Sequence, residues 1–242
     1  MTTHTLEVWG DLACFTRPEM KVERFSYPVI TPSAARGIFD AIYWDGKREQ
    51  QGKESVMRPY FHWQITRIEV LKMPRYIALR RNEVKGCVPG QATLNQWMAG
   101  AEPEPLWADG NDETTGRTQR QTMALKNVRY RLTARIEPKS GNDWSKLNAC
   151  FQRRARAGKC FQQPYFGCRE FPAFFEYLEN PAPAATAPFD QHLGFMLYDV
   201  FDLRKEVVRE KDGPFITLFD AHVRNGVLEV PAFASAEVKK PC

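Results

Sequence analysis

The stretch from Tyr27 to Trp44, YPVITPSAARGIFDAIYW, constrains the fold of this chain most. Thr31 suits a helix N-cap, and Pro32 suits the first helical position, where its missing N–H costs no hydrogen bond. Five apolar residues then recur at helical spacing: Ala34, Ala35, Ile38, Ala41 and Ile42. A helix with such small residues packs closely on a sheet and carries Tyr43 to one end. Composition alone favours Tyr43 as an aromatic residue at the edge of the core.

The remaining signals place this helix second in the order strand, helix, strand, strand, helix, strand. The strands are expected at residues 5–15, 61–73, 125–136 and 164–178, and the second helix from Asp143 to about Ala157. This order is that of ferredoxin-like α+β folds with an antiparallel sheet, which RNA-recognition modules share. The sequence therefore predicts a ferredoxin-like domain over residues 1–180, with an insertion at about 81–116 and a loop at 47–58.

A Pro/Ala run, PAPAATAP at 181–188, predicts a linker after this domain. Three further strands are expected, at 193–203, 215–223 and 227–231. Asn225-Gly226 is a strong signal for a two-residue hairpin turn between the last two. Residues 189–242 are therefore predicted to form a small antiparallel β-domain that ends in a polar, frayed tail from 232 onward.

Basic charge is concentrated in one segment of the chain. From Arg117 to Arg169 there are 13 Lys and Arg against two acidic residues. Within it, Arg129, Arg131 and Arg135 alternate along one strand, so their side chains are expected on one face. Such a stripe predicts phosphate binding, although acids folded nearby could also balance a solvated face.

Further cations are candidates for RNA contacts. Arg36 and Lys47 lie on and beyond the first helix, and Arg153, Arg154 and Arg156 crowd the end of the second. Cations at a helix C-terminus also complement the helix dipole, so the last three have a structural explanation of equal weight.

Several classes of protein lack support in the sequence. There is no phosphate-binding G-x-x-x-x-G-K-[ST] loop, no G-x-G-x-x-G after a strand and no G-x-S-x-G elbow. The six cysteines form no C-x-x-C pair, which favours reduced thiols in a cytoplasm. No apolar run is long enough for a membrane helix, and the start has no signal peptide, so a cytoplasmic protein without a membrane partner is expected.

No cofactor or metal site is expected from the sequence either. The four histidines are far apart, and no acidic cluster is typical of a two-metal nuclease. Cleavage of nucleic acid would therefore use a metal-free route, in which the RNA 2′-hydroxyl attacks the phosphate.

Long stretches of the chain resemble the Cas5d family of CRISPR-associated proteins, found in subtype I-C. The resemblance rests on WGDLACFTRPEMKVERFSYPVITPSAARGIFDAIYW, MRPYFHWQITRIEVL, NVRYRLTARIE, NDWSKLNACFQRRARAGKCF and PYFGCREFPAFF. Individual positions that fit the family pattern are Gly10, Tyr27, Pro28, Pro32, Ser33, Gly37, Tyr43 and Trp44. The match covers roughly residues 5–180 and is looser in the C-terminal strands.

The resemblance implies an endoribonuclease that binds the hairpin of CRISPR repeat RNA. It implies metal-free processing to a 5′-hydroxyl and a cyclic phosphate, after which the protein holds the 5′ handle beside the other subunits of a Cascade-type complex. In the family, a tyrosine ending the first helix acts with a Lys-His pair before the second helix. Tyr43 matches the tyrosine, but Asn142 and Asp143 stand where the pair is expected. Lys139 and Lys146 flank this site and are candidates for the missing cation.

Two alternatives remain open at this point. The absence of the Lys-His pair favours a non-catalytic RNA-binding scaffold subunit of the same complex. A metal-dependent DNA nuclease or a DNA-binding protein would use the same basic surface, so DNA is a further candidate partner.

Overall fold

The computed structural model describes residues 2–20, 22–52, 54–85, 89–103, 116–139 and 141–241. The chain divides into two compact units. The first comprises Met1–Ile77 and Met123–Cys242, and the second comprises Ala78–Thr122. All candidate site residues lie in the first unit.

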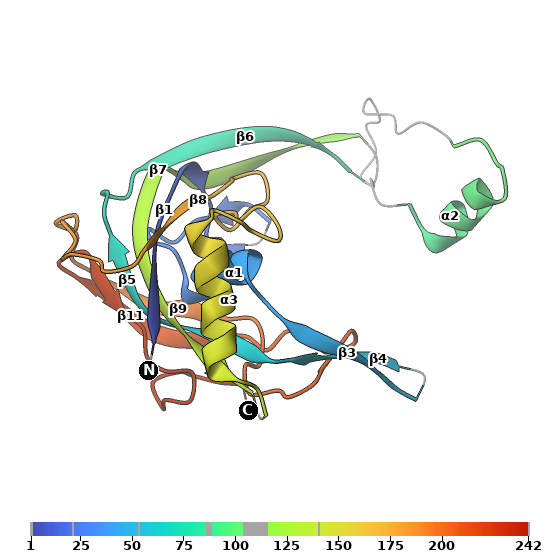
Figure 1. The fold of residues 1–242 in the computed structure, drawn as a ribbon. Coiled ribbons are helices and arrows are strands. Elements are labelled where there is room, and N and C mark those ends of the chain that lie inside the picture. Colours follow the sequence, from blue (N-terminus) through green and yellow to red (C-terminus); the bar gives the residue numbers. More distant parts are fainter. Residues whose placement is uncertain are drawn as a thin grey trace. The chain divides into compact units, whose positions relative to one another are not determined.

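An antiparallel sheet forms the frame of the first unit (Figure 1). Its strands follow the order β8 (Phe174–Leu178), β1 (Thr3–Ala13), β7 (Arg117–Pro138), β5 (Phe61–Val70), β12 (Val227–Glu229), β11 (Thr217–Arg224) and β9 (Gln191–Asp199). The short strand β2 (Arg24–Phe25) also pairs with β7. The fold is therefore a mixed α+β fold built on antiparallel strands, as the sequence predicted at this coarse level.

Two helices pack on this sheet, α1 (Pro32–Ile42) after β1 and α3 (Trp144–Arg156) after β7. Alternate residues of the strands meet them in an aromatic core. The ring of Trp63 on β5 lies 4.9 Å from that of Phe39 on α1 and 4.5 Å from that of Phe151 on α3. His4 on β1 joins this cluster and is bonded to Asn148 Oδ1 at 2.6 Å. The cluster fixes the positions of both helix ends that form the candidate site.

Helix α1 begins as the sequence predicted. The Thr31 hydroxyl accepts a hydrogen bond from the Ala34 N–H at 3.2 Å, and Pro32 occupies the first turn. The helix ends before Tyr43, whose carbonyl accepts a hydrogen bond from Trp63 Nε1 at 3.0 Å. The Ile42 carbonyl accepts another from Arg154 Nε at 2.8 Å. Side chains of β5 and α3 therefore satisfy the carbonyls at the end of this helix.

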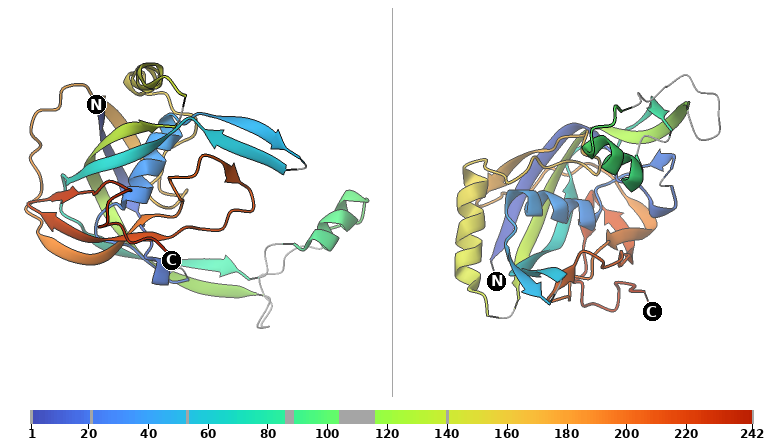
Figure 2. Two further views of the ribbon diagram at one scale, coloured as in Figure 1. Left: turned by 90° about the horizontal axis from the view of Figure 1, so that it is seen from below. Right: turned by 90° about the vertical axis from the view of Figure 1, so that its right-hand side faces the viewer.

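Residues 47–51 and 54–58 lie in strands, which corrects the predicted loop at 47–58. Strand β3 (Gly46–Gln51) pairs with β4 (Glu54–Pro59), and β10 (Val208–Arg209) pairs with β4. Figure 2 shows β3 and β4 as a paired ribbon leading away from the end of α1. Most of their side chains are charged or polar and at least partly exposed, so the apolar alternation by which strands are recognised is absent.

The C-terminal strands continue the main sheet, which differs from the predicted separate β-domain at 189–242. Strand β12 pairs with β5, with Leu228 opposite Ile68. The predicted hairpin is confirmed, because Asn225 and Gly226 join β11 to β12 with φ of 48° and 72°. The tail is not frayed throughout, since Phe233 and Val238 are buried.

The predicted linker at 181–188 lies against the sheet. The Ala187 N–H donates to Val70 O at 2.8 Å, and the Ala182 carbonyl accepts from Arg131 Nη1 at 2.6 Å. This segment is therefore held by β5 and β7.

The second unit contains part of the predicted insertion. Strand β6 (Tyr76–Val84) pairs with β7, and α2 (Gln91–Met98) lies beyond it. The rest of the predicted insertion, at 86–88 and 104–115, lies outside the described residues.

Candidate active site

Tyr43 lies at the C-terminal end of α1, with its side chain at the edge of a pocket. Its ring stacks on Phe61, with ring centroids 5.3 Å apart, and the residue is 9% exposed. Its hydroxyl donates a hydrogen bond to Asp45 Oδ2 at 3.4 Å. Burial, the most important cause, raises the pKa of Tyr43 above its ordinary value, and Cys150 and Asp45 raise it further. Tyr43 is therefore a neutral phenol that can donate a proton or a hydrogen bond.

The pocket beside Tyr43 has a volume of about 510 Å³. One wall is the end of α1 with Asp45, and the other is the first turns of α3. Lys146, Cys150 and Arg153 all line it, because their spacing of four and three residues places them on one face of α3. The site thus combines a phenol with two cations, which is a suitable arrangement for stabilising charge on a phosphate.

The start of α3 has a structural role. Asp143 is its N-cap, and its Oδ1 accepts hydrogen bonds from Ser145 N at 2.9 Å and Lys146 N at 3.3 Å. These bonds orient the first turn so that the Lys146 side chain emerges into the pocket. Within the described part of the chain, the Lys146 ammonium has no carboxylate partner.

Lys139, the other candidate cation, lies elsewhere. It is buried, and its Nζ donates a hydrogen bond to Leu203 O at 2.6 Å, with Glu206 Oε1 at 4.0 Å. Burial lowers the pKa of Lys139. Because its ammonium is held by the chain after β9, Lys146 and not Lys139 is brought together with Tyr43.

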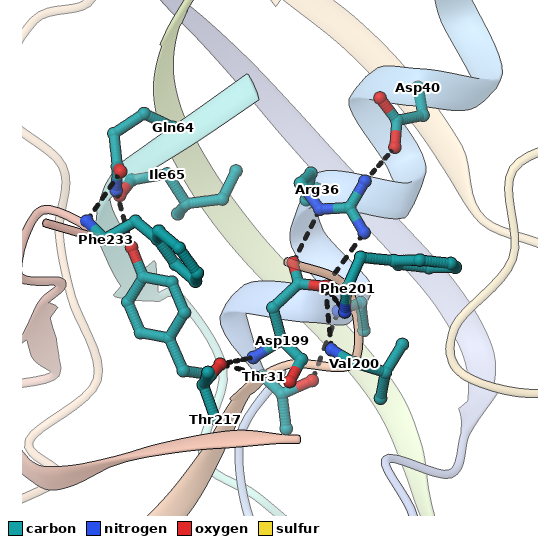
Figure 3. A network of polar contacts seen from close by, with 12 residues as sticks. Thr31, Arg36, Asp40, Gln64, Ile65, Asp199, Val200, Phe201, Thr217 and Phe233 are labelled. Atoms are coloured by element: carbon teal, nitrogen blue, oxygen red, sulfur yellow. Dashed lines mark hydrogen bonds and ion pairs between the residues drawn. The ribbon is translucent and has the colours of Figure 1, made fainter. Parts of the chain in front are cut away.

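Arg36 was predicted to contact RNA, but its guanidinium is part of a buried polar network (Figure 3). Its Nε lies 2.6 Å from Asp199 Oδ2 and its Nη2 lies 3.1 Å from Asp199 Oδ1, and Nη1 pairs with Asp40. Asp199 in turn accepts hydrogen bonds from the backbone N–H groups of Val200 and Phe201. This network joins α1 to the end of β9, so the geometry assigns Arg36 a structural role.

The predicted arginine stripe on β7 has acidic neighbours, one on the neighbouring strand β1 and one on β7 itself. Glu7 on β1 lies 2.6 Å from Arg129 Nε and 3.7 Å from Arg131 Nη2. Arg135 Nε lies 2.6 Å from Glu137 Oε1. Arg131 is also covered by the chain at Ala182. The geometry therefore favours the alternative reading, in which acids folded nearby balance the arginines.

The other predicted cations are divided between structure and surface. Arg154 closes the end of α1, and Arg156 pairs with Glu179. Lys47 on β3 is exposed and lies 3.4 Å from Glu49. Six arginines on β7 and α3 were predicted to contact RNA, and all lie in the described part of the chain. Of these six, Arg153 alone lines the pocket of Tyr43.

Sequence reasoning missed Asp45, Cys150 and Arg153 as neighbours of Tyr43. The spacing of Lys146, Cys150 and Arg153 was a usable signal for a shared helix face. Asp45 had no comparable signal, because the turn from α1 into β3 decides where its side chain points. Within the described residues, no group of three His, Cys, Asp or Glu side chains is placed to hold a metal ion. None of the described helices has the length and apolar character needed to cross a membrane.

The fold belongs to the α+β class, with helices packed on an antiparallel sheet, and two solved structures share it. A CRISPR-associated protein is 18% identical with a TM-score of 0.63, covering 98% of this chain and 96% of its own. A functionally uncharacterized protein from Streptococcus mutans is 16% identical with a TM-score of 0.58, covering 98% and 97%. At these identities the likeness concerns the fold alone.

Sequence comparison identifies the family within this class. The Cas5d family model, described as CRISPR-associated protein (Cas_Cas5), matches residues 4–231. The chain therefore belongs to the Cas5d family of CRISPR-associated proteins. Two relatives carry the name CRISPR pre-crRNA endoribonuclease Cas5d. The one from Mannheimia succiniciproducens is 39% identical over 97% of each chain, and the one from Thermus thermophilus is 35% identical over 94% of this chain and 90% of its own.

Proposed function

We propose that this protein is an endoribonuclease that binds the repeat hairpin of precursor CRISPR RNA and cleaves it. Cleavage proceeds without metal by attack of the 2′-hydroxyl, leaving a cyclic phosphate and a 5′-hydroxyl. The protein then holds the 5′ handle within a subtype I-C surveillance complex in the cytoplasm. The names of the two relatives support the substrate class and the reaction.

The observation that carries the catalytic part is the pocket that brings Tyr43 together with Lys146 and Arg153. The two cations can neutralise the charge that develops on the phosphate, which is the task a metal ion performs in other nucleases. Because its pKa is raised, Tyr43 acts as a hydrogen-bond or proton donor and not as the base.

We also infer that β1, α1, β5, β7, α3 and β8 form a ferredoxin-like unit. The order β8-β1-β7-β5 supports this inference, with α1 between β1 and β5 and α3 between β7 and β8 along the chain. In this unit the pocket walls come from the end of α1, from α3 and from the connections next to them, so the site lies beside the sheet and not on its open face.

A second candidate is a non-catalytic subunit that only binds the RNA handle. The start of α3 favours it, because Asn142 and Asp143 replace the Lys-His pair of the family and Asp143 is engaged as the N-cap. The two candidates differ in one observable, which is cleavage of the repeat RNA.

The test is a cleavage assay with RNA of the repeat sequence from the protein's own CRISPR array, in excess EDTA. We expect cleavage by the wild-type protein, and we expect Tyr43→Phe to lower the rate by on the order of 10²–10⁴, because one positioned proton-transfer group is lost. RNA affinity should stay the same, since only one oxygen atom is removed.

The control is a repeat RNA with a single 2′-deoxy nucleotide at the mapped cleavage position, which should bind without being cut. A wild-type cleavage rate for Tyr43→Phe would show that this tyrosine is a structural residue at the edge of the core and not a catalytic one. Binding without cleavage by the wild-type protein would favour the scaffold subunit. Activity that requires added magnesium or manganese would favour a metal-dependent mechanism.

A further inference from the structure

We propose that Asp45 is the general base of this nuclease, which takes the proton from the 2′-hydroxyl in place of the missing histidine. This proposal rests on the proposed function, because it assigns a role in the same pocket. Asp45 follows α1 by three residues and lies in the short connection to β3, on the wall opposite the α3 cations.

The other titratable groups that line the pocket are poor candidates for this role. Tyr43 stays protonated because burial raises its pKa. Tyr60 is a second phenol, a type of group that is protonated at neutral pH. Asp143 accepts two backbone hydrogen bonds as the cap of α3. Lys146 and Arg153 are cations, and the Cys150 sulfur accepts a hydrogen bond from Arg153 Nη2 at 3.5 Å. Among the described residues that line the pocket, Asp45 is the remaining carboxylate.

Both oxygens of the Asp45 carboxylate have a hydrogen-bond partner, and the contact of Oδ2 is the longer of the two. Its Oδ1 accepts a hydrogen bond from Gly46 N at 2.8 Å, while its Oδ2 accepts from the Tyr43 hydroxyl at 3.4 Å. The backbone around it is anchored, since Asp45 O accepts from Tyr60 N at 3.1 Å. A side chain on Gly46 would meet the Arg58 carbonyl at 2.9 Å, so this turn is closely packed. A base held in this way needs little reorganisation during the reaction.

The reaction that follows from this geometry balances its protons. The 2′-hydroxyl gives its proton to Asp45 Oδ2, and the freed oxygen forms a bond to phosphorus while Lys146 and Arg153 face the charged phosphate. The P–O5′ bond then breaks, and Tyr43 donates its proton to the departing 5′-oxygen. The protonated Asp45 returns a proton to Tyr43 across the 3.4 Å between them. The products are a cyclic phosphate and a 5′-hydroxyl, and both side chains recover their starting state.

The test is single-turnover cleavage of the repeat RNA by Asp45→Asn in excess EDTA, measured from pH 5.5 to pH 8.5. Asparagine keeps the acceptor for Gly46 N–H but cannot take a proton. We expect the rate to fall by on the order of 10²–10⁴ with unchanged RNA affinity. We also expect the residual rate to rise about tenfold per pH unit, because hydroxide must then remove the proton, whereas the wild-type rate should vary much less.

Glu49→Gln is the matched control, because it removes one negative charge from neighbouring β3 without lining the pocket. It should cleave at the wild-type rate with the wild-type pH profile. A wild-type rate and profile for Asp45→Asn, with Tyr43→Phe still impaired, would overturn the role of Asp45 and leave the proposed function standing. No cleavage by the wild-type protein would overturn both proposals together.

Discussion

At the scale of single residues, burial decides which ionisable groups of this protein are free to act. Lys139 and Lys146 are seven positions apart and equally basic in sequence, yet one ammonium is bound to a buried carbonyl and the other enters the pocket. The phenol of Tyr43 is likewise kept protonated by its surroundings. The chemistry available in the pocket is therefore set by packing as much as by residue type.

His62 gives a pH-dependent prediction for stability. Burial, followed by the charges of Lys139 and Arg36, lowers the pKa of His62 to about 4. An unfolded histidine binds its proton below about pH 6.5, so between these values the unfolded chain holds more protons than the folded one. The contribution of His62 to stability is therefore lost as the pH falls from about 6.5 to about 4.

We expect His62→Gln to remove this dependence, so that the wild-type protein loses about 3 kcal/mol relative to the variant over this range. Urea unfolding of both proteins at several pH values measures the difference. Asp40 acts in the opposite direction, because burial raises its pKa to about 6 and its contribution falls as the pH rises from about 4 to about 6. Because Asp40 is present in both proteins, the difference between them isolates the contribution of His62. Parallel curves of unfolding free energy against pH would contradict the prediction.

At the scale of elements, the sequence predicted a helix, strand or turn correctly where the residues of that element themselves show the pattern typical of it. The cap at Thr31, the alternation along β7 and the Asn225-Gly226 turn all lie within a few residues of the structure that they specify. The hairpin β3–β4 was missed because few of its side chains are buried. The partner of Arg129 and Arg131 was missed because Glu7 lies more than 120 positions away and meets them only through strand pairing.

The arginines of β7 give a prediction that separates stability from RNA binding. The Arg131 side chain is 13% exposed. It donates a hydrogen bond to Ala182 O and forms an ion pair with Glu7. We expect Arg131→Gln to lower the free energy of unfolding by about 1–3 kcal/mol, because the largely buried Glu7 carboxylate loses a neighbouring cation and the Ala182 carbonyl loses a charged hydrogen-bond donor. The salt dependence of RNA binding should not change.

Arg153→Gln is the comparison, since Arg153 is exposed and lines the pocket. It should leave stability unchanged and reduce the slope of log affinity against log salt by about one. Filter binding at several salt concentrations measures this slope. A reduced slope with unchanged stability in Arg131→Gln would instead restore the phosphate-binding stripe that the sequence predicted.

At the scale of the whole molecule, the division into units follows contacts and not composition. The Pro/Ala run suggested a boundary at 181–188, but the second unit is Ala78–Thr122. Composition could not reveal this, because the pairing of β12 with β5 joins segments about 160 positions apart. The succession of the main strands and helices along the chain was predictable, whereas the continuation of the sheet by the C-terminal strands was not.

This division predicts that the second unit can be removed without loss of cleavage. In the variant, the dipeptide Asn-Gly replaces residues 79–122. It joins the remaining part of β6 to β7 as a two-residue hairpin turn, next to the backbone hydrogen bond from Lys126 N to Arg75 O. We expect cooperative unfolding and a wild-type cleavage rate, because Tyr43, Asp45 and Lys146 all lie in the first unit. Circular dichroism and the cleavage assay measure both. A folded variant with weakened RNA affinity would assign part of the RNA contact to the second unit.

The pairing of β12 with β5 also determines how the polypeptide can be dissected. A fragment that stops at residue 180 lacks β12, so the backbone N–H and C=O groups of β5 that face it lose their partners. Ile68 and Val70, which are buried in the intact chain, would then lie on an open strand edge. Such an edge is a template for association with a second chain. The Pro/Ala run that looks like a natural point of division is therefore a place where cutting the chain yields an aggregating fragment and not an independent domain.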